Sequence, residues 1–205
     1  MYKSNILFKT YYPKFIWDLP AIKPTIYLTF DDGPIPEITD FVLEQLEFNE
    51  AKATFFCIGE NIQENRAVFE KIVANGHSVG NHTMNHLNGW STDNQLYIND
   101  FNECQLIIPE VNLFRPPYGK IKKKQSEIVL KTHQIIMWDI VSGDFLSDLN
   151  AENALKFCIK HTRSGTIIVF HDSIKAFKNM SYILPRYIEH FKERGFVFES
   201  INLLK

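Results

Sequence analysis

The sequence alternates short apolar runs with stretches of helical spacing, and five of the apolar runs end in an ionisable side chain. The carboxyl ends of parallel strands share one edge of an α/β sheet or barrel, so side chains that follow such strands converge there. The pattern therefore predicts a fold in which ionisable side chains gather at one edge of the sheet. The five segments are Thr29-Phe30-Asp31-Asp32-Gly33-Pro34, Asn81-His82-Thr83-Met84-Asn85-His86, Phe114-Arg115-Pro116-Pro117-Tyr118, Trp138-Asp139 with Asp144 close behind, and Val169-Phe170-His171-Asp172.

The spacing of apolar residues predicts seven strands separated by helices. Strands are expected at residues 25–30, 53–57, 77–81, 113–115, 135–138, 166–170 and 196–198, and helices at 37–48, 60–74, 93–108, 122–131, 151–162 and 182–193. This order predicts an α/β fold, a distorted (β/α) barrel of about seven parallel strands in a single domain, residues 25–205. Residues 1–24 contain three prolines and are expected to form an irregular arm with buried aromatic side chains.

Composition excludes several classes of protein. The net charge of −2 gives no basic face for nucleic acid. No segment approaches the roughly 18 apolar residues of a membrane span, and the apolar run at residues 6–8 is shorter than the about 7–15 residues of a signal peptide.

Cys57, Cys104 and Cys158 are expected to be free thiols, which favours a reducing compartment. We therefore expect a cytoplasmic location, and association with the cell envelope remains open.

Two histidines have the spacing of a metal site. His82 and His86 are four residues apart, so a helix or tight turn lets both contact one ion. Metalloproteases with this spacing carry a catalytic Glu directly after the first His, and Thr83 occupies that position here. A general base must therefore come from another segment, and Asp31 and Asp32 are the candidates. Two histidines and one carboxylate are a common catalytic zinc set.

The adjacent carboxylates Asp31 and Asp32 point to the same kind of site. A strand-to-helix turn capped by one Asp would account for one of them. The second charge is unfavourable beside the first unless a cation relieves the repulsion. One Asp would then bind the ion, and the other would accept a proton from the attacking water.

The five segments in this order resemble the motifs of the polysaccharide deacetylase family, also called carbohydrate esterase family four or the NodB-like homology domain. The resemblance extends from about residue 25 to the C-terminus, and its first two motifs are highly specific. It implies that Asp31 is the general base and that Asp32, His82 and His86 bind one divalent ion, with zinc expected first and cobalt, nickel, manganese or iron also compatible. It also implies that Arg115 keeps Asp31 charged and oriented.

The remaining roles follow from the same resemblance. The backbone N–H of Tyr118 is expected to stabilise the oxyanion, and His171, supported by Asp144, to act as general acid. Two positions depart from the family pattern, since Phe145 replaces a Trp and Val169 replaces a Leu. Val141 also stands where the family often has a second Asp. The residues expected to contact substrate are Phe145, Val169, Pro116, Pro117, Tyr118 and Trp138.

Structural roles are expected for the other polar residues of interest. His77 is assigned to the core or to support of the site. Asp139 and Asp172 are expected to brace the site by hydrogen bonds. Solvated surface is expected for three histidines on or beside helices, His133, His161 and His190.

The leading hypothesis is a metal-dependent hydrolase that removes acetyl groups from N-acetylated amino sugars in a glycan or a glycan precursor. One alternative is an esterase for O-acetyl groups, or another amide hydrolase, on the same fold. Because esters need less help at the leaving group, a histidine acid matters far less to an esterase. A second alternative is a catalytically silent glycan-binding module. The glycan, the native metal and the oligomeric state stay open.

Overall fold

The computed structural model describes residues 1–4, 6–108 and 111–203. Within them a nine-stranded sheet has the order β1-β7-β8-β2-β3-β4-β5-β6, and β9 pairs with β2. Every pairing is parallel except that of β1 with β7. The strands are β1 Tyr2–Lys3, β2 Thr25–Asp31, β3 Ala53–Cys57, β4 Ser78–Asn81, β5 Leu113–Phe114, β6 Gln134–Ile135, β7 Ile140–Val141, β8 Ile167–His171 and β9 Val197–Phe198. The predicted distorted (β/α) barrel in a single domain is confirmed.

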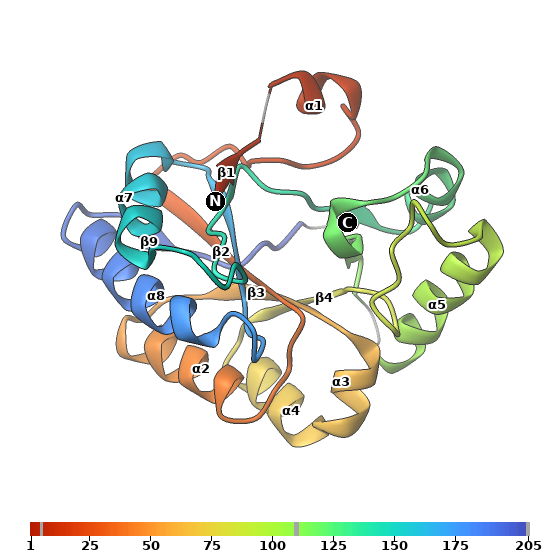
Figure 1. Cartoon of the computed structure of the whole chain (residues 1–205), viewed down its shortest axis with the longest axis horizontal. Helices are drawn as coiled ribbons and strands as arrows, with labels where there is room; N and C mark the ends of the chain where they lie inside the picture. The colour runs from red at the N-terminus through yellow and green to blue at the C-terminus, as the bar shows by residue number, and fades with distance from the viewer. Residues whose placement is uncertain (5, 109–110, 204–205) are drawn as a thin grey trace.

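Helices pack around this sheet, with α2, α4, α7 and α8 on one side and α5 and α6 near its other end (Figure 1). Apolar residues at helical spacing explain the packing, since α2 buries Val42 and Leu46 completely. Side-chain caps begin two helices: Asp93 accepts hydrogen bonds from backbone N–H groups of α5, and Asn150 does so for α7. The helices are α1 Ile6–Tyr11, α2 Ile38–Phe48, α3 Gly59–Glu64, α4 Arg66–Ala74, α5 Asn94–Ile107, α6 Lys123–Val129, α7 Ala151–His161, α8 Phe177–Lys192 and the 3₁₀ turn η1 Pro117–Gly119.

Two predicted helices have different bounds in the structure. The predicted helix at 60–74 is two helices, because Asn65 leaves the helical conformation (φ −126°, ψ 45°) and its side-chain amide donates to the carbonyls of Pro34 and Asn61. The helix predicted to begin at residue 182 begins five residues earlier, at Phe177. Its first turn is tied to the core because the Asn179 amide donates to the carbonyls of Asp144 and Leu146.

The N-terminal arm, residues 1–24, is more ordered than predicted. Its strand β1 adds antiparallel to β7, and further along the arm Ile16 forms a parallel bridge with Ile136. Asp18 forms an antiparallel bridge with Thr166 at the start of β8. The arm therefore occupies the gap between β6 and β8. These pairings join residues more than 100 positions apart, so local sequence patterns do not predict them.

Burial of the arm aromatics follows the prediction only in part. Phe15 and Trp17 are buried, whereas Tyr11 is 77% exposed. Asp139 is fully buried and pairs with Lys9 of the arm at 2.9 Å and with Arg163 at 3.7 Å. The expectation that Asp139 braces the site is therefore wrong. It holds the arm at the opposite end of β8, beside Thr166.

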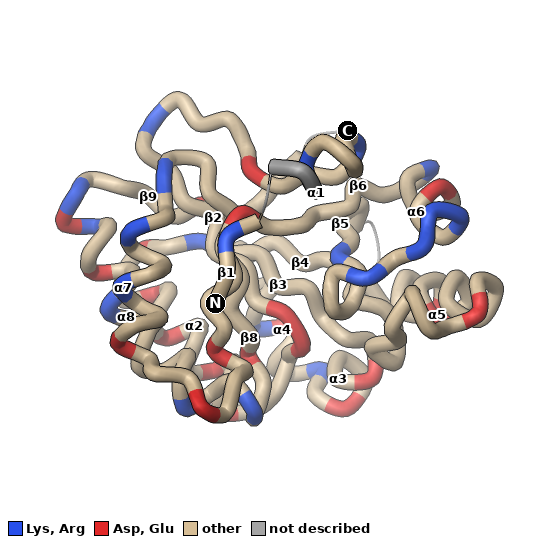
Figure 2. Tube along the Cα trace, turned by 45° about the horizontal axis from the view of Figure 1, so that its top comes forward, with Lys and Arg blue, Asp and Glu red and all other residues tan. Residues whose placement is uncertain are grey.

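Side chains of β2 alternate between two hydrophobic cores. Ile26, Leu28 and Phe30 pack toward the helices, and Thr29 and Asp31 face the barrel interior. The three cysteines are buried and free, as predicted. Among the described residues, no helix has the length and apolarity that crossing a membrane requires. Figure 2 shows acidic and basic residues interspersed over the elements in view, with a run of lysines before α6.

Candidate active site

The sheet register brings the predicted residues to one rim. Asp31 ends β2 and is the register partner of His171, which ends the adjacent strand β8. His82 follows the last residue of β4, and Arg115 follows the last residue of the neighbouring strand β5. Asp31, His82 and His171 line a cleft of about 640 Å³ at the carboxyl ends of the strands, and the fully buried Arg115 contacts Asp31. Five segments of the sequence thus meet in space as their positions at strand ends predict.

Asp32, His82 and His86 form a cluster with the geometry of a metal site. One ligand atom from each lies within 4.8 Å of the others. The Asp32 Oδ1 atom is 3.3 Å from His86 Nε2 and 3.8 Å from His82 Nε2. The His82 Nδ1 atom lies 2.7 Å from the Arg115 carbonyl oxygen. Because that carbonyl can only accept, Nδ1 carries the proton and Nε2 presents its lone pair to the cluster.

The protonation of the histidines favours a cation at this cluster. Burial lowers the pKa of His82 to about 4, despite the opposing effect of Asp31. Burial likewise lowers the pKa of His86, against the opposing effect of Asp32. Both imidazoles are therefore neutral at pH 7, as metal ligands must be. The donor set of two neutral imidazoles and one carboxylate fits a divalent ion.

The second carboxylate of the pair, Asp31, is not part of the cluster but is bound to Arg115. Arg115 is fully buried, and its Nη1 donates to Asp31 Oδ1 at 2.6 Å and to Thr29 Oγ1 at 2.8 Å. Its other guanidinium nitrogens donate to the carbonyls of Ile136 and Met137. Burial raises the pKa of Asp31, but the charge and hydrogen bond of Arg115, together with the neighbouring His82 and His171, outweigh burial and hold the pKa below its usual value. Asp31 is therefore held as an oriented carboxylate.

The imidazole of His171 lies beside Asp31, at the end of the adjacent strand β8. The Asp144 carboxylate contacts His171 twice, accepting from its backbone N–H and lying 2.8 Å from Nδ1. Burial lowers the pKa of His171, but the charge and hydrogen bond of Asp144, together with the charges of Asp32 and Asp31, outweigh burial. The result is a pKa of about 9. His171 thus holds a proton at neutral pH, as a general acid requires.

The loops that carry these groups are conformationally strained. Of six non-glycine residues with positive φ among those described, four lie here: Asp32, Thr83, His86 and Tyr118. Such strain persists only where surrounding contacts hold it, and it concentrates at functional sites. Asn61 donates to the Asp32 carbonyl at 2.6 Å, and Asn81 accepts from the Thr83 N–H at 2.8 Å.

Asp172 and Asp100 brace the two loops that carry the cluster. The Asp172 carboxylate accepts from the Gly33 N–H at 3.0 Å and from the Thr39 hydroxyl at 2.6 Å, so it holds the turn after Asp32, as predicted. Burial raises its pKa to about 7. Asp100 accepts from the backbone N–H of Met84 and of Asn85, just before His86.

Apolar residues complete the walls of the cleft. Trp138, Val141, Phe145 and Val169 line it, and the Phe145 ring lies 5.0 Å from that of His171. Among the other predicted contact residues, Tyr118 lines the cleft with its ring 4.6 Å from His86. Pro116 and Pro117 are buried and do not line it. Pro116 immediately precedes the turn η1 and Pro117 is its first residue, so both lie directly before Tyr118 in the chain.

A model of the polysaccharide deacetylase family matches residues 18–134, more than half of the chain. The chain belongs to the polysaccharide deacetylase family. Members of this family are metalloenzymes, in agreement with the possible site at Asp32, His82 and His86. The matched residues include this cluster, Asp31 and Arg115, and they end before Asp144 and His171.

Individual relatives extend the likeness over nearly the whole chain. A Bacillus cereus protein named peptidoglycan-N-acetylglucosamine deacetylase is 31% identical over 92% of this chain and 91% of its own length. An Azorhizobium caulinodans chitooligosaccharide deacetylase is 31% identical over 72% of this chain and 73% of its own. The crystal structure of a peptidoglycan N-acetylglucosamine deacetylase, bound to 4-naphthalen-1-yl-N-oxidanyl-benzamide, has a TM-score of 0.86 at 26% identity, covering 92% of this chain and 91% of that one.

Some supporting residues of this polysaccharide deacetylase were not predicted from its sequence. Asp100 was missed, although its place seven residues into a helix with a buried face marked it as an inward carboxylate. The prediction of a solvated His133 is wrong, because that residue is buried and its Nε2 lies 2.8 Å from the Gln105 amide oxygen. His77 is buried, as predicted, and its Nδ1 accepts from the Ala53 N–H.

Proposed function

We propose that this protein hydrolyses the N-acetyl group of amino sugars in a glycan or glycan precursor, with residues 25–205 as the catalytic domain. One arrangement carries the proposal: Asp31 and His171 end adjacent strands beside the three-residue cluster, and their shifted pKa values favour an ionised Asp31 and a protonated His171. Amide hydrolysis needs both, because a base activates water and an acid protonates the poor amine leaving group. The named relatives support amino sugars as the substrate class.

The proposed mechanism assigns one step to each residue. Asp31 accepts a proton from the attacking water, and its pairing with Arg115 keeps it ionised and aimed. The Tyr118 backbone N–H donates to the oxyanion as it forms. His171 then protonates the leaving nitrogen, and Asp144 stabilises the imidazolium until the proton is given up. Phe145 and Val169 enclose the acetyl methyl group.

Asp32, His82 and His86 would hold the divalent ion. When bound, such an ion supplies Lewis-acid polarisation of the acetyl carbonyl and lowers the pKa of water to about 7. Zinc is the proposed native ion for two imidazoles and a carboxylate, and cobalt, nickel, manganese or iron(II) suit the same donors.

Acetate release from N-acetylglucosamine oligomers, peptidoglycan and O-acetylated glycans tests this function. We expect release from the N-acetylated substrates, loss of nearly all of it after a chelator, and recovery when zinc or cobalt is added back. An esterase would release acetate only from the O-acetylated glycans. A silent binding module would release none from any substrate with metal present.

The pKa of His171 predicts how the rate depends on pH. Because this pKa is raised to about 9, the acid form is complete at neutral pH and is lost as pH rises through about 9. We expect kcat/KM to fall as the pH rises through about 9. Asp144→Asn removes the main group that raises the pKa, so the fall should begin at lower pH. The exposed Asp148 in the same loop offers a control, and Asp148→Asn should leave the profile unchanged. If kcat/KM fell at the same pH in the wild type and in Asp144→Asn, the role of His171 as the general acid supported by Asp144 would be contradicted.

A further inference from the structure

A groove lies between the N-terminal arm and helix α6, and it shares no lining residue with the catalytic cleft. Its volume is about 540 Å³. Three of its lining residues are lysines and one, Glu127, is acidic, so the groove carries a net positive charge. We call it the basic groove. It is lined by Tyr11, Tyr12, Pro13, Lys14, Phe15, Lys123, Ser126, Glu127, Leu130 and Lys131.

Further lysines beside the groove extend this positive charge. Lys120 and Lys122 precede α6, and Lys124 lies in its first turn. Figure 2 shows this run of lysines where the chain leads into α6. The net charge of −2 for the whole chain conceals this local excess. We call the six residues the lysine face, which consists of Lys14, Lys120, Lys122, Lys123, Lys124 and Lys131.

The lysine face has no carboxylate partner of its own. In the part of the chain that the structure describes, no ion pair engages any of its six lysines. By contrast, Lys9, Lys71 and Lys156 each pair with an aspartate or glutamate. Positive charges gathered in this way repel one another, and a bound anion relieves the repulsion. The charge pattern therefore indicates an anionic partner.

Exposed apolar side chains lie among these lysines. Tyr11 lines the groove and is 77% exposed. Ile128, 44% exposed, follows Lys124 by four residues and so lies on the same side of α6. The Trp90 ring, 58% exposed, lies 5.3 Å from the Lys120 ammonium. Lysines mixed with exposed aromatic and aliphatic side chains are typical of a surface that lies on anionic lipid, whereas a soluble polyanion needs the charges alone.

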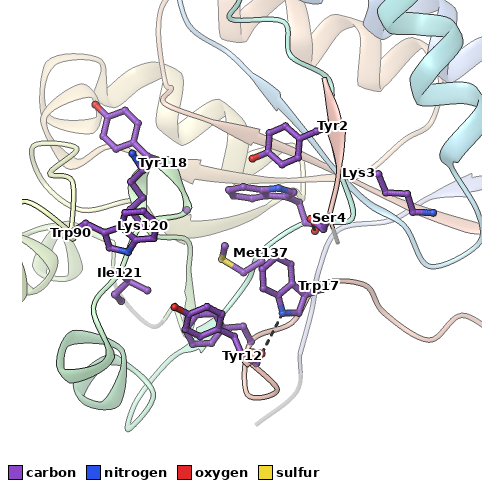
Figure 3. A pocket seen from close by; sticks show the side chains of 13 residues that line it. Tyr2, Lys3, Ser4, Tyr12, Trp17, Trp90, Tyr118, Lys120, Ile121 and Met137 are labelled. Carbon is purple, nitrogen blue, oxygen red and sulfur yellow. Dashed lines mark hydrogen bonds between the residues drawn. The ribbon is translucent and has the colours of Figure 1, made fainter. Parts of the chain in front are cut away.

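The lysine face adjoins the catalytic cleft. The pocket drawn in Figure 3 joins the two, because it shares Tyr12 and Phe15 with the basic groove and Tyr118 and Lys120 with the cleft. A protein docked through this face would therefore hold its cleft close to the surface on which it lies.

We propose that the lysine face docks this protein on an anionic lipid surface, with a phosphate headgroup in the basic groove. Lysine is a compact point charge that suits phosphate, and the groove places Lys14, Lys123 and Lys131 around one headgroup. The rings and aliphatic side chains beside them enter the headgroup layer. The inference goes beyond the proposed function and does not depend on it.

Sedimentation of the full chain with lipid vesicles tests the docking. The vesicles are phosphatidylcholine with or without phosphatidylglycerol, and the variant is Lys123→Gln/Lys131→Gln. The matched control is Lys160→Gln/Lys178→Gln, at two exposed lysines on α7 and α8 that form no ion pair within the described residues. We expect the wild type and the control to bind only the anionic vesicles, and the face variant to bind them roughly 30-fold more weakly, from about fivefold for each lysine. Binding should also weaken as salt is added.

Two results would overturn the proposal directly. One is a wild-type protein that does not bind the anionic vesicles, and the other is equal vesicle affinity in the face variant and the control. Vesicle binding is measured without turnover, so a failure to release acetate leaves this test intact. Acetate release from a soluble N-acetylglucosamine oligomer should be unchanged in both variants, because none of the four lysines lines the cleft.

A further variant separates a lipid surface from a soluble polyanion. Tyr11→Ser removes an exposed ring and leaves every lysine in place. We expect it to weaken vesicle binding and to leave the affinity for inorganic polyphosphate unchanged, because only the lipid surface receives the ring. Tighter binding to polyphosphate or to a single-stranded oligonucleotide than to the vesicles, with no effect of Tyr11→Ser on either, would overturn the lipid assignment.

Discussion

Replacing Asp31 by asparagine should abolish acetate release while the metal stays bound. Asp31 is the base of the proposed mechanism, and loss of general-base catalysis typically costs about 10²–10⁴-fold in rate. Its carboxylate is absent from the cluster of Asp32, His82 and His86, so metal occupancy should not change. The measurements are kcat for acetate release and metal content of the purified protein.

The stability of this variant needs its own control. The neutral amide would leave the fully buried Arg115 without its anionic partner, and breaking a buried pair commonly costs about 3–5 kcal/mol. Arg115 keeps its bonds to Thr29, Ile136 and Met137, which limits the loss. Asp40→Asn, which breaks the surface ion pair with Lys71, is the control. Comparing the thermal unfolding of the two variants shows whether a loss of activity in Asp31→Asn comes from unfolding or from loss of the carboxylate. A folded, metal-loaded Asp31→Asn protein with wild-type activity would remove Asp31 from the mechanism.

Replacing His82 by alanine should instead remove the metal, and activity with it. His82 is one of the three proposed ligands and the most buried of them. Substitution of an outer-shell partner typically weakens metal binding 10–100-fold, so loss of a direct ligand should weaken it by more than about 100-fold. Metal content after dialysis and titration with zinc or cobalt measure the change.

His77 provides a matched control for this substitution. It is also a buried histidine and lies just before β4, whereas His82 lies just after it. His77→Ala should lower the thermal stability and leave metal affinity unchanged. Unchanged metal occupancy in the His82→Ala protein would refute the ligand role of His82. Loss of metal in both variants would indicate damage to β4 rather than loss of a ligand.

Much of the fold could be predicted because its strands lie where local apolar patterns are strongest. The β3 prediction matches the structure at both ends, since five consecutive buried residues precede a helix. Predictions failed where a distant partner decides the conformation. The side-chain bonds of Asn65 divide one helix into two, and those of Asn179 extend another toward its N-terminus. The two-residue strand β7 exists because β8 and the arm pair with it.

The candidate site also combines residues that the local sequence predicts with contacts that only tertiary packing creates. His82 and His86 were predicted from their four-residue spacing and the carboxylate pair from its place after a strand, and the family resemblance assigned Asp32 to the metal. The contact between the His82 ring and the Arg115 carbonyl joins two segments through three-dimensional packing alone. Asp100 supports the His86 loop from inside α5, where its helical spacing from Tyr97 and Cys104 places it on the buried face. A second pocket beside the cleft likewise combines the N-terminal arm with loops from the middle of the sequence.

Arg115 contacts both Asp31 and the cluster of Asp32, His82 and His86. Its guanidinium fixes Asp31, and its carbonyl oxygen fixes the ring of His82. A small shift of this one residue would misplace the proton acceptor and a ligand together, so directed evolution of new acyl specificity should leave it untouched. Phe145, partly exposed in the loop after β7, is the better starting point, because its ring lines the cleft 5.0 Å from that of His171 and makes no contact with Arg115 in the site described above.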